Sequence, residues 1–189
     1  GLKGTMSEFE LGLFRQRSLE AIRAKARRGE HYTMVAVGYV RTPDGRCEMD
    51  PDQRIQQAIR TIFEKFEEMS SVRQVLLWCR QEGFVLPSVR YGPQGRSIEW
   101  ALPVYQTIHK LLRNLAYGGA YVFGRTVTRT AIVDGRACKR KGAALAPEEW
   151  MVLLPGRHAG YITWEQHQRN VARIRENANM KGLMRTRGA

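Results

Sequence analysis

The sequence predicts an α+β fold that is mainly α, with a helix-turn-helix-like helical core, small β-hairpins and a long N-terminal helix. Three observations predict it. Apolar residues recur at helical spacing in three segments between residues 51 and 115. Short β-prone stretches are joined by turn sequences, of which Thr42-Pro43-Asp44-Gly45 is the clearest. The first 28 residues lack proline and are rich in helix formers.

The N-terminal helix is expected from about Thr5 to Arg28, and Gly29 is a suitable stop signal. Its apolar residues lie on more than one face, which suits a helix that packs on a body and also on a partner. Its end is strongly basic, more so than a favourable interaction with the helix dipole requires, although that simpler explanation stays open. The basic residues are Arg23, Lys25, Arg27 and Arg28.

A hairpin is expected next, with Val35–Val40 as the first strand and Arg46–Met49 as the return. Asp50 then predicts an N-cap and Pro51 the first helical position. The apolar stripe of that helix comprises Ile55, Ile59, Ile62, Phe63 and Phe66.

A second helix is expected to begin at Ser70 or Ser71, to bury one apolar face, and to end at Gly83. The residues of that face are Val72, Val75, Leu76 and Cys79. The segment from Phe84 to Glu99 is expected to be a basic, turn-rich loop, with Arg90 and Arg96 as candidate DNA-binding residues.

Pro103 predicts the start of a third helix that runs to about Asn114. Its apolar stripe predicts a core-facing side, so only the opposite polar side bears on function. That polar side comprises Gln106, His109, Lys110 and Arg113. Simpler explanations stay open for two of them. His109 would then be a surface residue without a role, and Arg113 would only interact favourably with the C-terminal end of the helix.

The last third predicts strands at Ala120–Thr126, Thr130–Val133 and Trp150–Leu154, with a turn at Asp134-Gly135. A capping box at Thr163 predicts a helix to about Asn179, followed by a frayed end. A basic loop is expected at Arg136, Lys139, Arg140 and Lys141.

The charge of the chain is its strongest compositional signal. The 189 residues include 31 Lys and Arg against 18 Asp and Glu, a formal net charge of +13. The excess is concentrated in the C-terminal third. Such an excess suggests a polyanionic partner, nucleic acid before a membrane surface, against the alternative of a solvated basic surface. No apolar run approaches the length of a membrane span.

Residues for catalysis or metal binding are not evident in the sequence. The three cysteines, Cys47, Cys79 and Cys138, form no C-x-x-C pair, so we expect no zinc site and no cofactor. Their odd number and the lack of a signal peptide fit a reducing cytosol. The four histidines lack metal-ligand spacing, and no nucleophile motif is present, so we expect no catalytic residue in this chain.

A set of short motifs resembles a known family. In order they are Gly38-Tyr39-Val40, Asp50-Pro51, Ile62-Phe63, Ser70-Ser71-Val72, Trp100 and Leu111-Leu112-Arg113-Asn114-Leu115-Ala116-Tyr117-Gly118-Gly119. Over about residues 36–125 their order and spacing resemble the recombinase domain of large serine recombinases, which include serine integrases, transposases and resolvase-invertase relatives. The first 28 residues, with Glu10 and Arg17, resemble the long helix that ends the catalytic domain of this family and builds its dimer interface.

The resemblance implies a division of the chain into three parts. Residues 1–30 would end the long helix of a catalytic domain, residues 31–126 would be the DNA-binding recombinase domain, and residues 127–189 would form a hairpin and helix leading to a zinc ribbon. The catalytic domain with its serine nucleophile, like the ribbon, would lie outside a chain that begins at Gly1, so the chain is expected to be a fragment. The parent would be a bacterial or phage protein of the cytoplasm, associated with the nucleoid and encoded by a mobile element, that self-associates as a dimer or tetramer.

The expected function is therefore the recognition of half-sites in double-stranded DNA for site-specific recombination, including integration or transposition. The polar side of the third helix would read bases in the major groove. The basic cluster at residues 23–28, with the linker His31–Thr33, and the basic loop at residues 136–141 would hold phosphates. Two other functions stay open: a stand-alone helix-turn-helix transcriptional regulator and a basic protein-interaction domain that does not bind DNA.

Overall fold

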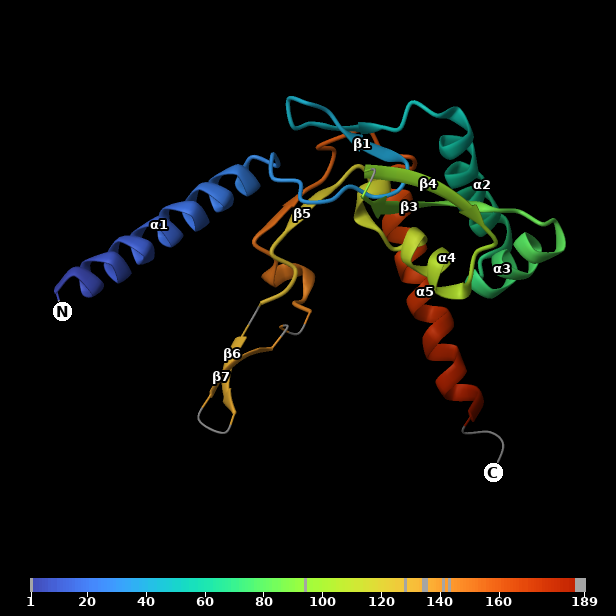
Figure 1. Cartoon of the computed structure of the whole chain (residues 1–189). Helices are drawn as coiled ribbons and strands as arrows, with labels where there is room; N and C mark the ends of the chain where they lie inside the picture. The colour runs from blue at the N-terminus through green and yellow to red at the C-terminus, as the bar shows by residue number, and fades with distance from the viewer. Residues whose placement is uncertain are drawn as a thin grey trace.

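The computed structural model confirms an α+β fold that is mainly α (Figure 1). It describes residues 2–93, 95–127, 129–133, 136–140, 142 and 144–185. The helices are α1 (Leu2–Arg27), α2 (Gln53–Met69), α3 (Val72–Gln81), α4 (Tyr105–Leu112) and α5 (Trp164–Arg185), with 3-10 turns at Leu115–Gly118 and Pro147–Glu149. The strands are β1 (Tyr39–Arg41), β2 (Cys47–Met49), β3 (Leu86–Gly92), β4 (Gly95–Ala101), β5 (Tyr121–Phe123), β6 (Arg129–Val133), β7 (Arg136–Arg140) and β8 (Val152–Leu154).

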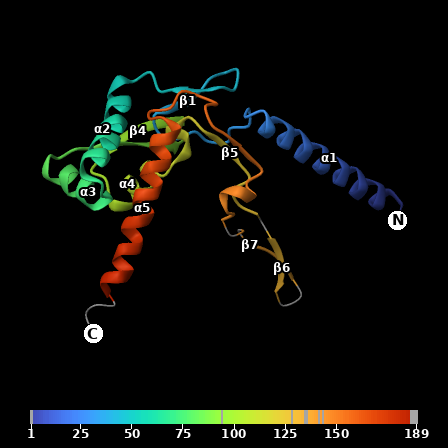
Figure 2. The ribbon, with the colours of Figure 1, turned by 180° about the vertical axis from the view of Figure 1, so that it is seen from behind.

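The predicted N-terminal helix is confirmed, and it projects from the rest of the molecule in both views (Figures 1 and 2). Gly29 ends it with φ of +68°, a left-handed conformation that costs glycine little. The Gly29 N–H donates to the Ala26 carbonyl and the Glu30 N–H to the Lys25 carbonyl, the pair of bonds that defines a Schellman motif.

The first hairpin is shorter than predicted, because only Tyr39 and Val40 of the expected strand pair with β2, together with Arg41. The start of α2 was also placed wrongly. The N-cap is Asp52, whose carboxylate accepts from the Arg54 N–H, and not Asp50. Asp50 is buried and instead accepts from the Asp52 N–H at 3.1 Å, so it supports the turn before the helix.

The predicted stripe of α2 is confirmed as the centre of the hydrophobic core, and the predicted face of α3 packs beside it. Only Ser70 and Ser71 separate the two helices, and Ser70 takes a left-handed φ of +56°. Helix α5 fixes this junction, since Arg173 donates to the Ser70 hydroxyl at 3.0 Å and Asn177 donates to the Ser70 carbonyl at 2.8 Å.

The expectation of a loop from Phe84 to Glu99 is wrong. The segment forms most of a regular antiparallel hairpin in which Leu86 pairs with Ala101 and Gly92 with Gly95. Pro87 fits because each strand of a two-stranded sheet has a free edge, where a missing N–H breaks no ladder bond. The hairpin separates α3 from α4, and Pro103 precedes α4 by two residues rather than opening it, since the N-cap is Val104.

The C-terminal third forms two further pairs of strands and the last helix. Strand β5 pairs with β8, and β6 pairs with β7. In both views the β6–β7 hairpin and the C-terminal half of α5 extend to the same side of the molecule (Figures 1 and 2). The Thr163 hydroxyl accepts from the Gln166 N–H at 3.2 Å, as the capping box predicts, but α5 continues to Arg185, beyond the expected end. The predicted turn at Asp134-Gly135 lies outside the described residues.

Candidate nucleic-acid interface

The polar side of α4 lies on the surface as predicted. Gln106, Lys110 and Arg113 are exposed, while Ile108 and Leu112 are buried on the opposite side. The spacing of three and four residues places the exposed side chains on one face of the helix. His109 is half-buried and stacks on Tyr105, with ring centroids 5.8 Å apart. Partial burial lowers the pKa of His109, and the positive charge of Arg113 lowers it further.

A groove of about 820 Å³ runs beside this face of α4. Its walls come from α4, from the segments that flank the β6–β7 hairpin, and from α5. Three arginines from these three sources line it, namely Arg113, Arg125 and Arg175, and all three are exposed. Among the described residues that line the groove, none is acidic. Such a surface offers bidentate donors to an anionic ligand without an internal carboxylate to compete for them.

The back of the groove is largely apolar and aromatic. Trp164 and His167 stack face to face, with ring centroids 5.4 Å apart, and Trp150 donates from its indole to the Leu145 carbonyl. Rigid aromatic walls between arginines allow contact with sugars or bases as well as phosphates.

Of the predicted contact residues, the structure brings His109, Lys110 and Arg113 into the groove, and Gln106 lies on the same face of α4 outside it. The other predicted clusters lie elsewhere. Arg23, Lys25, Arg27 and Arg28 are exposed at the end of α1, where Arg28 pairs with Glu30 at 2.9 Å.

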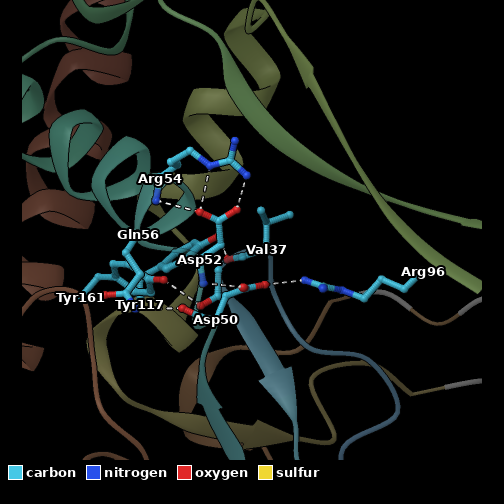
Figure 3. Close-up of polar contacts among 9 residues, drawn as sticks. Val37, Asp50, Asp52, Arg54, Gln56, Arg96, Tyr117 and Tyr161 are labelled. Carbon is cyan, nitrogen blue, oxygen red and sulfur yellow. Dashed lines mark hydrogen bonds and ion pairs between the residues drawn. The ribbon is translucent and has the colours of Figure 1, made fainter.

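Arg90 and Arg96 both lie on the β3–β4 hairpin and both have acidic partners. Arg90 pairs with Glu99 across the two strands at 2.9 Å, and both side chains are exposed. Arg96 pairs with the buried carboxylate of Asp50 at 2.8 Å, so it joins the hairpin to the turn before α2 (Figure 3). An arginine that neutralises a buried carboxylate has a structural role, which was not expected for Arg96.

The predicted basic loop is a strand over most of its length. Arg136, Lys139 and Arg140 lie in β7, and Lys141 lies outside the described residues. Several further polar residues line the groove but were not predicted from the sequence, among them Arg125, Gln168 and Arg175. The available signal was the run of polar residues on α5 opposite its buried Asn170 and Ile174.

Two histidines next to this region are held in their neutral form. Burial lowers the pKa of His158, although the hydrogen bond between its Nε2 and the Ala116 carbonyl opposes the shift. Burial also lowers the pKa of His167, which the Arg113 carbonyl partly opposes. The structure therefore favours the uncharged ring at both positions.

We predict that these histidines make stability depend on pH. Below the ordinary histidine pKa of 6.5 the unfolded chain binds protons that the folded chain resists, so the contribution is present above that pH and is lost as the pH falls. The free energy of unfolding should decline between about pH 7 and pH 5.5, by at most about 1.4 kcal/mol per pH unit for each histidine. Urea unfolding at several pH values measures this, and an unchanged slope in His167→Gln would show that His167 does not contribute.

Within the described ranges, no helix combines the length and apolarity needed to cross a membrane. In the same part of the chain, no group of three or more His, Cys, Asp or Glu side chains is placed to hold a metal ion.

Comparison with protein families identifies the family of this chain. A family model described as Recombinase matches residues 54–177, which run from α2 into α5 and include every described residue that lines the groove. A curated relative from Sinorhizobium fredii (strain NBRC 101917 / NGR234), "Uncharacterized protein y4bA/y4pH", is 36% identical over 195 aligned positions. The match includes the whole of this chain but only 28% of the relative.

Comparison with solved structures gives similar folds at low sequence identity. A crystal structure described as an LSR-DNA complex has a TM-score of 0.51 and 16% identity, with 83% of this chain and 38% of that chain covered. A second structure, titled "Sequence Requirements of the Listeria innocua prophage attP site", has a TM-score of 0.49 and 16% identity, with 83% and 50% covered. The chain thus spans less than two thirds of each of these proteins.

Proposed function

Because the chain belongs to the Recombinase family, we propose that it is part of a large serine recombinase and binds double-stranded DNA at the half-site of a recombination site. The observation that carries the proposal is the groove beside α4, which collects arginines from three distant segments and contains no acidic side chain among its described lining residues. The solved structure described as an LSR-DNA complex adds support, because a protein with a fold similar to that of this chain is bound to DNA there.

In the proposed complex, α4 lies in the major groove. Gln106 and Arg113 read base edges, since Gln and Arg make the bidentate contacts that distinguish adenine and guanine. Arg125 and Arg175, which line the protein groove from other segments of the chain, hold phosphates and fix the register of α4. The neutral ring of His109 adds a hydrogen bond that does not depend on charge.

The basic clusters outside the groove extend this contact. The basic cluster at residues 23–28 and the basic β6–β7 segment add phosphate contacts beyond those of α4. We further propose that the parent protein carries out DNA strand exchange in the cytoplasm, with the nucleophilic serine on another domain, and that exposed Phe9, Phe14 and Leu19 of α1 contribute to self-association.

Base readout by α4 gives a direct test of this proposal. Duplexes selected from a random pool by the chain should share a sequence, and Gln106→Ala and Arg113→Ala should each relax the preference at one or two base pairs, by about 1–3 kcal/mol. The matched control is Gln57→Ala on α2, which lines a different concavity and should leave the preference unchanged. If both α4 variants lower the affinity for every duplex equally, α4 is not the reading helix.

The same selection separates sequence-specific DNA binding from a basic protein-interaction domain. A basic protein-interaction domain would bind all duplexes with similar, strongly salt-dependent affinity and would select no sequence. A stand-alone regulator would select a sequence but would do so without the catalytic domain that a recombinase parent supplies. Family membership disfavours the regulator.

A further inference from the structure

The segment between α1 and β1 is held by side chains from the rest of the molecule near both of its ends. Five of its backbone carbonyls accept hydrogen bonds from side chains outside it. The pairs are Arg28 with Arg157 Nε (3.1 Å), His31 with Tyr121 Oη (3.0 Å), Tyr32 with Arg41 Nη1 (3.1 Å), Val37 with Tyr117 Oη (2.9 Å) and Gly38 with Tyr161 Oη (2.7 Å). A flexible tether would leave these carbonyls to water.

The contact nearest to α1 is made by Arg157. The Schellman motif at Gly29 satisfies the carbonyls of Lys25 and Ala26, and the carbonyl of Arg28 receives the Arg157 guanidinium instead. The packing there is close, because a Cβ added to Gly29 would lie 2.6 Å from Arg157 Nε and 2.9 Å from Arg157 Cδ. The helix end and Arg157 therefore fit each other in shape as well as in hydrogen bonding.

Arg157 is itself anchored to the domain. Its N–H donates to the Gly119 carbonyl at 2.9 Å, in the turn after Leu115–Gly118. Beside it, the ring of Tyr32 packs edge-on against Tyr121 with centroids 5.1 Å apart, and His31 packs against Phe123 at 5.6 Å. The start of the segment thus rests on β5, and Arg157 connects it to the core from a position 129 residues along the chain.

We infer that Arg157 and Tyr121 are positioning residues that fix the direction in which α1 leaves the recombinase domain. Without them, α1 would turn freely about the residues after Gly29, since nothing else of the described chain pairs with the carbonyls of Arg28 and His31. With them, the basic cluster at the end of α1 keeps a fixed place relative to α4. Both hydrogen bonds form within the protein alone, so α1 is held in this direction whether or not the groove binds DNA.

The test measures the distance between α1 and the core by pulsed electron spin resonance. Spin labels are attached at Gly12→Cys on α1 and Glu67→Cys on α2, both exposed positions, in a chain that carries Cys138→Ser. Cys47 and Cys79 are buried, and burial raises the pKa of each thiol to about 11, so they resist labelling. Labelling of the chain without the two introduced cysteines verifies this.

The parent should give one narrow distance distribution. The double variant Arg157→Ala with Tyr121→Phe removes both hydrogen bonds but keeps the aromatic ring, and it should broaden the distribution roughly twofold or more. The matched control, Arg169→Ala with Tyr105→Phe, changes an exposed arginine and an exposed tyrosine that do not contact the segment, and it should stay narrow.

Thermal unfolding of each variant shows whether the core is intact. If the core of the double variant is unfolded, the distance distribution is measured instead in the single variant Arg157→Ala, which changes only a surface residue. The same broadening is expected there. A distribution in the Arg157 variant as narrow as that of the parent would overturn the inference, as would a parent distribution that is already broad.

Discussion

Replacement of the three groove arginines, Arg113, Arg125 and Arg175, by alanine should lower the affinity for duplex DNA roughly 100-fold at physiological salt. In the proposed complex each guanidinium donates to a phosphate or a base, and each phosphate that a cation neutralises contributes about 0.9 to the slope of log K against log salt. The triple variant should therefore also flatten that slope by about 2 to 3. Fluorescence anisotropy with a labelled duplex, repeated over a range of salt concentrations, measures both quantities.

A charge-matched control separates the groove from the net charge of the chain. Arg54, Arg73 and Arg80 are exposed on α2 and α3, outside the groove, and their replacement removes the same three positive charges. The control should change the affinity only slightly, because distant exposed charges are screened at physiological salt. If the two triple variants lose affinity equally, the chain attracts DNA by its overall charge of +13 and the groove has no special role.

The helical core was predictable because its apolar residues repeat with the period of a helix. Ile55, Ile59 and Phe66 fall on one stripe, and packing into the shared hydrophobic core removes this stripe from water. The apolar stripe of α4 likewise predicted which side of that helix faces the core and which side is exposed. Helix starts were harder to predict, because Asp50 and Asp52 flank one proline and either can cap; the burial of Asp50 against Arg96 decides between them.

The β3–β4 hairpin was missed for a physical reason. Strand β4 is exposed or half-buried along its whole length, its alternation of polar and apolar residues is confined to Ser97–Trp100, and Pro87 argues against a strand. The groove was not predicted because it forms only in the tertiary structure. Arg113, Arg125 and Arg175 are separated by 12 and 50 positions in the sequence, and only the pairing of β5 with β8 and the packing of α5 bring them together.

A large loss of stability is expected from Gly38→Ala. Gly38 has φ of +86°, where alanine is strained, and a Cβ there would lie 2.2 Å from Ile59 Cδ1 and 2.7 Å from Tyr161 Oη. Both neighbours belong to the core, and the Gly38 carbonyl already accepts from Tyr161 Oη and from the Asp50 N–H at 2.8 Å, so the backbone has little freedom to retreat. Strain and overpacking together should cost about 2–5 kcal/mol of the free energy of unfolding, measured in urea.

Gly45 supplies the control, because its φ of +85° is nearly the same and an added Cβ would meet only Arg41 Nη2, at 3.7 Å. Gly45→Ala should therefore carry the backbone strain alone, about 1 kcal/mol. The difference between the two variants isolates the cost of the collision with Ile59 and Tyr161. Equal losses would mean that the core opens around Gly38 without penalty, and the close packing of this segment on α2 would then contribute nothing to the stability of the domain.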